Sequence, residues 1–258
     1  MTIRPILPAI LAAVFALLAG PAQAELKKGW LEYSHGSTKL KGYLVHDDSL
    51  TGKRPAILMI HAQAGMSATT QQHAEVWAKL GYVSFVADIF GYGEGILPKG
   101  GEEMRVQTAI YRNDRALMRA RTQAGYDALA AHPLVDSGKI AAIGYCFGGT
   151  VSVEFGSTGA PLVANVAIHG SFGGHEAGWA KNVKGRFLIL HGAEDKTYPL
   201  TRVTSVIDEL RAAKVPFQLE VYSGTGHGFS TPKNKDEERA IQQATATTGR
   251  TLKEVFGL

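Results

Sequence analysis

Short apolar runs recur along the sequence and are separated by longer mixed segments. Within these runs, apolar residues do not alternate clearly with polar ones, which is typical of strands buried on both faces of a sheet. Two early runs, at 30–34 and 40–45, are separated by a short turn and predict an antiparallel pair. Further strands are expected at 55–60, 82–87, 139–143, 163–168, 187–190 and 217–222.

Helical segments fill the intervals between the expected strands. The segment at 107–131 is rich in alanine and dotted with arginine, which indicates a surface helix with a solvated basic face. The other helices are expected at 74–80, 148–155, 200–213 and from 235 onwards. Strands that alternate with helices predict an α/β fold, in which helices cover both faces of a mostly parallel central sheet. In such a sheet, active residues belong on loops that leave the carboxyl ends of strands.

Residues 1–24 have the pattern of a signal peptide. Arg4 is followed by a nearly unbroken apolar stretch at 6–18, and Ala22-Gln23-Ala24 provides the small-residue cleavage pattern. An uncleaved anchor is the alternative, but the apolar stretch is shorter than the ~20 residues of a membrane span. We therefore expect cleavage after Ala24, export to the periplasm or the medium, and no membrane partner after cleavage.

The composition is that of a globular protein, because 45% of the 258 residues are apolar and 19% are charged. We expect one α/β domain at 25–258, since no repeat or linker interrupts this part. The formal net charge is +4, and the Lys and Arg residues are scattered along the chain. This distribution argues against nucleic acid as a partner. The sequence leaves the oligomeric state undetermined.

Cys146 is the only cysteine, so the chain cannot form an internal disulfide. It lies in Gly144-Tyr145-Cys146-Phe147-Gly148-Gly149, after an expected strand and before an expected helix. This G-x-C-x-G pattern is the cysteine form of the nucleophile elbow, whose sharp turn needs glycines because side chains there would collide with backbone. The helix that follows favours the thiolate. The alternative is that Cys146 is a small buried residue with only a packing role. No Gly-Lys-Ser/Thr follows the turn, which excludes the usual phosphate-binding loop.

A nucleophile of this type needs a base and an orienting acid, and the chain order at such an elbow is nucleophile, acid, histidine. Asp195 follows the expected strand at 187–190, and His227 follows the one that ends at 222. Glu194 is the competitor for the acid role. The backbone N–H of Phe147, together with one near Gln63, is expected to form the oxyanion hole.

The other histidines are expected to have structural or surface roles. His61, His169 and His191 end apolar strands and are interpreted as structural residues beside the site, whereas His35, His73, His132 and His175 are interpreted as surface or loop residues. No H-E-x-x-H motif or paired Cys/His spacing occurs, so no metal site is expected.

The sequence resembles the dienelactone hydrolase family in HAQAGM (61–66), GYVSFVADIFGYG (81–93), KIAAIGYCFGG (139–149), HGAEDKTYP (191–199) and YSGTGHGFSTP (222–232). The resemblance implies an α/β-hydrolase fold and a hydrolase of enol-lactones or related esters, with a small-molecule ester or lactone as its substrate. It implies a Cys146–His227–Asp195 triad, oxyanion donors at Gln63 and Phe147, and no cofactor.

Two positions depart from the family pattern. A glutamate that holds the resting thiol away from the histidine is replaced by Ala62, and an arginine that holds a substrate carboxylate is replaced by Thr231. We therefore hypothesise that Cys146 rests as a thiolate paired with protonated His227, and that neutral esters are accepted.

Alternative functions are a thioesterase or broad carboxylesterase, a peptide-bond hydrolase, a non-catalytic binding protein on the same fold, and a redox thiol protein. The last is disfavoured because the lone cysteine has no resolving partner. Aromatic residues of two loops are weak candidates for substrate contacts: Phe90, Tyr92, Phe172 and Trp179. Three arginines are interpreted as a solvated helix face in preference to an anion-binding site: Arg112, Arg115 and Arg119.

Overall fold

Parallel strands build the centre of the molecule. The computed structural model describes residues 25–258, and the predicted signal peptide at 1–24 lies outside the described residues. Within the described part, eight strands form one sheet in the order β1-β2-β4-β3-β5-β6-β7-β8. The strands are β1 (Leu26–His35), β2 (Thr38–Asp47), β3 (Arg54–Ile60), β4 (Val83–Ala87), β5 (Val135–Tyr145), β6 (Ala164–Ile168), β7 (Arg186–Gly192) and β8 (Phe217–Tyr222).

The two expected types of strand pairing are both present. β1 pairs with β2 and β2 with β4 in antiparallel fashion, whereas the pairs from β4 through β3 to β8 are parallel. All five residues of β4 and of β6 are buried. Continuous apolar sequence therefore forms strands that are covered from both sides, as the pattern predicted.

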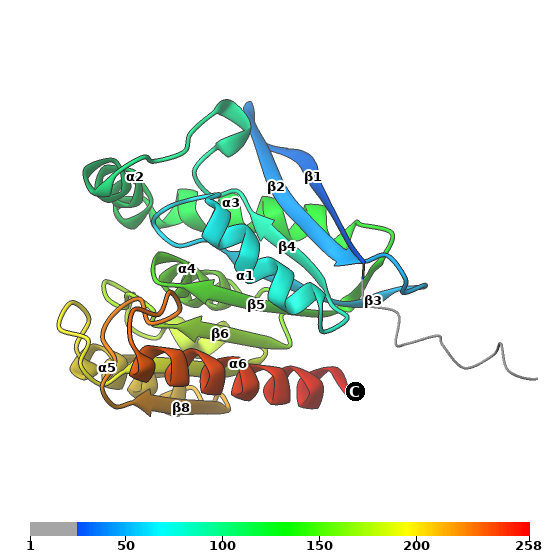
Figure 1. The fold of residues 1–258 in the computed structure, drawn as a ribbon. Helices are drawn as coiled ribbons and strands as arrows, with labels where there is room; N and C mark the ends of the chain where they lie inside the picture. The colour runs from blue at the N-terminus through cyan, green and yellow to red at the C-terminus, as the bar shows by residue number, and fades with distance from the viewer. Residues whose placement is uncertain (1–24) are drawn as a thin grey trace, which may run out of the picture.

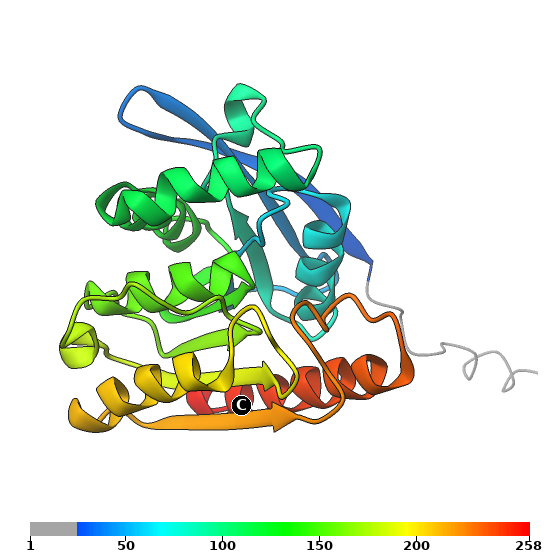
Figure 2. The same cartoon turned by 90° about the vertical axis from the view of Figure 1, so that its left-hand side faces the viewer.

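Helices cover the two faces of the sheet (Figures 1 and 2). α1 (Ala68–Ala78) and α6 (Lys235–Phe256) contribute buried residues to the core on one face. α3 (Arg115–Ala130), α4 (Phe147–Ser157) and α5 (Leu200–Ala212) do so on the other face. α2 (Gly101–Asn113) stands off from the sheet in Figure 1, and η1 (Tyr92–Glu94) and η2 (Trp179–Asn182) are short 3₁₀ turns. The prediction of a mostly parallel α/β sheet with helices on both faces is confirmed.

The expected single helix at 107–131 is wrong. The structure has two helices there, α2 and α3, separated at Asp114, whose backbone leaves the helical region with φ −119° and ψ 85°. The Asp114 carboxylate accepts a hydrogen bond from the Leu117 N–H at 2.8 Å and so caps α3. Likewise α1 begins at Ala68, earlier than expected, because the Ser67 hydroxyl accepts a hydrogen bond from the Thr70 N–H.

No helix among residues 25–258 combines the length and apolar character that crossing a membrane requires.

Candidate active site

Cys146 occupies a strained turn between β5 and α4. Its φ is 52° and its ψ −113°, a conformation that non-glycine residues rarely adopt. A Cβ at Gly144 would overlap the Gly148 carbonyl group, and one at Gly148 would overlap the Ile60 carbonyl oxygen. A Cβ at Gly149 would lie 2.6 Å from the Gly170 Cα. The glycines therefore let the turn approach its neighbours closely, as the elbow motif predicts.

The three candidate triad residues meet at the carboxyl ends of their strands. The distance from His227 Nε2 to Cys146 Sγ is 3.0 Å, and that from His227 Nδ1 to Asp195 Oδ2 is 2.8 Å. Asp195 is only 3% exposed, and its other oxygen accepts hydrogen bonds from the N–H groups of Thr197 and Tyr198. The carboxylate is therefore held in one orientation, and it holds the imidazole in turn.

Glu194, the competitor for the acid role, lies away from the imidazole. Its carboxylate is within 3.4 Å of the Gly224 N–H, in an exposed position. The structure therefore pairs Asp195, and not Glu194, with His227.

The environment of His227 favours the imidazolium. Burial by itself lowers the pKa of His227, but the hydrogen bond and charge of Cys146, together with those of Asp195, outweigh it. The net result is a pKa raised above the ordinary value of 6.5. The imidazolium is thus stabilised by the sulfur at Nε2 and by the carboxylate at Nδ1.

A cavity of about 310 Å³ opens beside the sulfur. Gln63 lines it together with Cys146 and His227. Phe147 is the first residue of α4, so its N–H has no acceptor within the helix. The two expected oxyanion donors therefore lie on the loop after β3 and at the start of α4.

The buried histidines at strand ends are held by hydrogen bonds. His61 Nδ1 lies 2.8 Å from the Ala62 carbonyl oxygen, and His191 Nε2 lies 2.9 Å from that of Tyr198. His169 Nε2 lies 2.7 Å from Ser230 Oγ. Burial lowers the pKa of all three, so they are neutral.

Two of the histidines that we interpreted as surface or loop residues make further contacts, His73 on α1 and His175 on the loop between β6 and η2. His73 is on α1, lines the Cys146 cavity and stacks on Tyr145 with ring centroids 4.3 Å apart. The His175 side chain is 6% exposed and pairs with Glu154. No periodic pattern indicated these contacts beforehand, because residues distant along the chain make them.

Three aromatic candidates for substrate contacts, Tyr92, Phe172 and Trp179, are not among the residues that line the Cys146 cavity. Tyr92 stacks on Trp30 with ring centroids 5.1 Å apart. Phe172 is fully buried and Trp179 is 8% exposed, and both pack in the core next to α5. Phe90, the fourth aromatic candidate, is also buried, at 2% exposed. Packing against apolar neighbours decides the position of these four rings. Met104 of α2, which sequence reasoning missed, lines the cavity instead.

The arginine face that we expected to be solvated is largely engaged. Arg115 and Arg119 form ion pairs with the buried Glu154 of α4 at 3.3 and 2.8 Å. Arg112 donates hydrogen bonds to Ser171 Oγ and to the Tyr198 hydroxyl. These contacts join α2 and α3 to α4 and to two loops at the carboxyl edge of the sheet.

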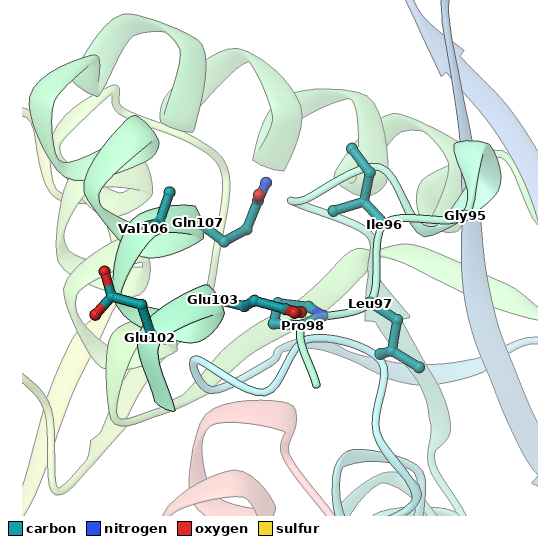
Figure 3. A pocket seen from close by; sticks show the side chains of 8 residues that line it. All are labelled: Gly95, Ile96, Leu97, Pro98, Glu102, Glu103, Val106 and Gln107. Carbon is teal, nitrogen blue, oxygen red and sulfur yellow. The ribbon is translucent and has the colours of Figure 1, made fainter. Parts of the chain in front are cut away.

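A second cavity, of about 400 Å³, lies between residues 95–98 and α2 (Figure 3). Its lining combines apolar Ile96, Leu97 and Val106 with the carboxylates of Glu102 and Glu103. Glu103 and Gln107 reach from the helix toward the opposite segment. None of the three candidate triad residues lines this cavity.

Among residues 25–258, no group of three or more His, Cys, Asp or Glu side chains is arranged to hold a metal ion.

Comparison with known proteins places the chain in a family. The model of the "Dienelactone hydrolase family" matches residues 40–256. A carboxymethylenebutenolidase homolog from Rattus norvegicus is 26% identical over 201 residues, which cover 76% of this chain and 78% of the relative.

Solved structures share the fold. The structure of a dienelactone hydrolase-like promiscuous phosphotriesterase from metagenomic libraries is 29% identical, with a TM-score of 0.83 and coverage of 89% of this chain and 98% of that one. A dienelactone hydrolase from Anabaena variabilis is 21% identical, with a TM-score of 0.64 and coverage of 86% and 96%. The chain therefore belongs to the dienelactone hydrolase family and has its α/β-hydrolase fold.

Proposed function

We propose that this hydrolase cleaves a neutral carboxylic ester or lactone through a thioester formed on Cys146. The observation that carries the proposal is the continuous hydrogen-bonded chain from Cys146 Sγ through the His227 ring to the buried Asp195. This is the geometry in which an imidazole serves a nucleophile with one nitrogen and is oriented through the other.

The proposed reaction has two halves. The Cys146 thiolate attacks the carbonyl carbon, and the N–H groups of Gln63 and Phe147 stabilise the oxyanion of the tetrahedral intermediate. As the intermediate collapses, the C–O bond breaks and His227 gives its Nε2 proton to the leaving alkoxide. His227 then takes a proton from water, whose oxygen attacks the thioester. The C–S bond breaks, which releases the acid and restores the thiolate beside imidazolium.

We propose that the resting enzyme already contains the thiolate–imidazolium pair. The sulfur lies within hydrogen-bond distance of His227, and the raised pKa of His227 supports a protonated ring. Ala62 lines the cavity at the position where the family pattern has a glutamate, and no carboxylate is among the residues that line the cavity. No acid of the cavity wall thus competes with His227 for the thiol.

Mass spectrometry of the protein mixed with a p-nitrophenyl ester tests this function. We expect a transient mass increase equal to the acyl group, located on the peptide that contains Cys146, and a matching burst of p-nitrophenol. The Cys146→Ala variant should show neither. Ser223→Ala changes an exposed hydroxyl and serves as the matched control. Full turnover by Cys146→Ala, or an acyl group on another residue, would refute the proposal.

A further inference from the structure

One wall of the Cys146 cavity contains a hydrogen-bonded pair that the proposed reaction does not use. His169 directly follows β6 with its backbone in the left-handed region, at φ 39°, and is only 2% exposed. Its Nε2 lies 2.7 Å from Ser230 Oγ, while its Nδ1 has no hydrogen-bond partner among residues 25–258. Both residues line the cavity that contains Cys146 and His227. A strained, buried and half-satisfied imidazole at such a position points to a functional role.

The protons of this pair do not balance within the protein. His169 is neutral, because burial and the adjacent charge of His227 hold its pKa well below 6.5. The pair then has one ring N–H and one hydroxyl O–H, but a single hydrogen bond joins the two side chains. If the ring proton is on Nε2, it is donated to Ser230 and the hydroxyl proton is left over. If it is on Nδ1, Ser230 donates to Nε2 and the Nδ1–H is left over. The Nδ1 atom is itself buried, so the first arrangement, in which Nε2–H is donated to Ser230, is the one that presents a left-over donor, the Ser230 hydroxyl, to the cavity.

The remaining wall indicates what kind of acceptor fits. Thr70 and His73 also line this cavity, and burial lowers the pKa of His73, so it is neutral as well. None of the described residues that line the cavity is Lys, Arg, Asp or Glu. A carboxylate would enter without a fixed partner cation other than the reacting His227, and its desolvation would be costly. An uncharged oxygen would accept the left-over hydrogen bond without that cost.

We propose that Ser230 and His169 form a specificity-determining subsite that donates a hydrogen bond to an uncharged oxygen of the substrate, additional to the ester that is cleaved. That oxygen belongs to a hydroxyl, ether or ketone group. The inference rests on the proposed function, since it concerns the substrate of the same site. It predicts a preference for oxygenated esters or lactones over hydrocarbon ones of the same shape.

Paired esters with a common p-nitrophenol leaving group test the subsite. p-Nitrophenyl methoxyacetate and 3-methoxypropionate each have a hydrocarbon match, butyrate and valerate, in which CH₂ replaces the ether oxygen. We expect Ser230→Ala to lower the ratio of kcat/KM between at least one oxygenated ester and its match by about fivefold to tenfold, the effect of one neutral hydrogen bond. Ser230→Thr, which keeps the hydroxyl, should restore the ratio. Intrinsic differences in ester reactivity cancel, because each ratio is compared with that of the unmodified enzyme.

The outcomes separate the two proposals. An equal loss of kcat/KM for both members of every pair would mean that Ser230 serves only the position of the His227 loop, and it would overturn the subsite. An unchanged ratio would overturn it too. The same pairs are also titrated into Cys146→Ala and into Cys146→Ala with Ser230→Ala, with binding followed by ligand-detected NMR. The ratio of the two affinities within each pair tests the subsite even if the unmodified enzyme hydrolyses neither ester. Absence of hydrolysis would refute the proposed function but not the subsite. Ser223→Ala, in the same loop, is the control.

Discussion

Two histidine–carboxylate pairs with nearly the same geometry lie in different parts of this molecule. His227 Nδ1 is 2.8 Å from Asp195, at the carboxyl edge of the sheet, and His175 Nδ1 is 2.7 Å from Glu154, beside α4. Asp195 is 3% exposed and Glu154 is 5% exposed. By the nitrogen–oxygen distance and by the burial of the carboxylate, the two pairs are nearly equivalent.

The second ring nitrogen and the other partners of the carboxylate distinguish the pairs. His227 Nε2 faces the Cys146 sulfur at 3.0 Å and borders a cavity, whereas His175 Nε2 has no hydrogen-bond partner among the described residues. Glu154 is also neutralised by two guanidinium groups, whereas Asp195 accepts its other hydrogen bonds from backbone N–H groups. The comparison indicates that a histidine–carboxylate pair can serve catalysis only where a nucleophile and substrate space meet its free nitrogen. Elsewhere the same pair joins helices and loops.

The largest expected difference between the pairs is in turnover. His227→Gln and Cys146→Ala should each lower kcat for a p-nitrophenyl ester by about 10⁴-fold or more, because residues of a triad act as one unit. Steady-state kinetics on folded variants, checked by circular dichroism, measures this. A loss of less than about tenfold for either variant would remove the triad from the mechanism.

The second difference is in stability and is expected at the other pair. Glu154→Gln leaves Arg115 and Arg119 without their carboxylate, so we expect the free energy of unfolding to fall by about 2–4 kcal/mol at pH 7. Partial solvation of both arginines keeps the loss from being larger. Urea unfolding measures the loss, and kcat below the unfolding temperature should stay within about twofold.

The pH dependence of that loss provides its control. Burial raises the pKa of Glu154, but His175, Arg115 and Arg119 outweigh it and lower the pKa below 4.5. The stabilisation is therefore present above pH 4.5 and should vanish as the pH falls through the native pKa of Glu154. A difference between the variant and the unmodified protein that persists in acid would exclude the ion pairs as its source.

A third experiment compares the titration of His227 with and without its sulfur partner. Burial lowers the pKa of His227, but Cys146 and Asp195 raise it overall above 6.5. The associated stability is fully present below pH 6.5 and is lost as the pH rises through the native pKa of His227. We expect Cys146→Ala to lower this pKa, as measured by NMR titration of the imidazole, and to remove part of the stability below pH 6.5. An unchanged imidazole titration would contradict the proposed thiolate–imidazolium pair.

The sequence was sufficient where a local pattern carries the information. β8 at 217–222 and the start of α6 at Lys235 coincide with their predictions, since the alternating strand pattern FQLEVY and a capping Asn234 mark them locally. The convergence of Cys146, Asp195 and His227 also followed, because the carboxyl ends of neighbouring parallel strands must lie at one edge. The break at Asp114 was not predicted, because helix-forming residues continue on both sides of Asp114. Only the capping hydrogen bond of its carboxylate marks the start of the second helix.

The lining of the cavity could not be predicted in the same way. Phe172 lies on the loop that follows β6 and Trp179 begins η2, but the core next to α5 buries both. Met104 instead reaches the cavity from α2. Such positions depend on which distant segment covers a loop, and no spacing in the sequence reports it. The hydrogen bond between His175 and Glu154, 21 residues away, could not be predicted for the same reason.

The smallest expected effect tests whether the second pair needs its histidine. In His175→Gln the amide can still donate to Glu154, and the two arginines still neutralise the carboxylate, so the charge balance of the cluster is preserved. The lost imidazole Nε2 had no hydrogen-bond partner among residues 25–258, so its removal leaves no new unsatisfied group. We expect a loss of less than about 1 kcal/mol in urea unfolding and no measurable change in kcat. The same substitution at His227 should abolish turnover, although both rings pair with a carboxylate through Nδ1 at nearly equal distances. A large loss of activity in His175→Gln would mean that the cluster at Glu154 positions the active-site loops, and the separation of the two pairs into a catalytic and a structural one would fail.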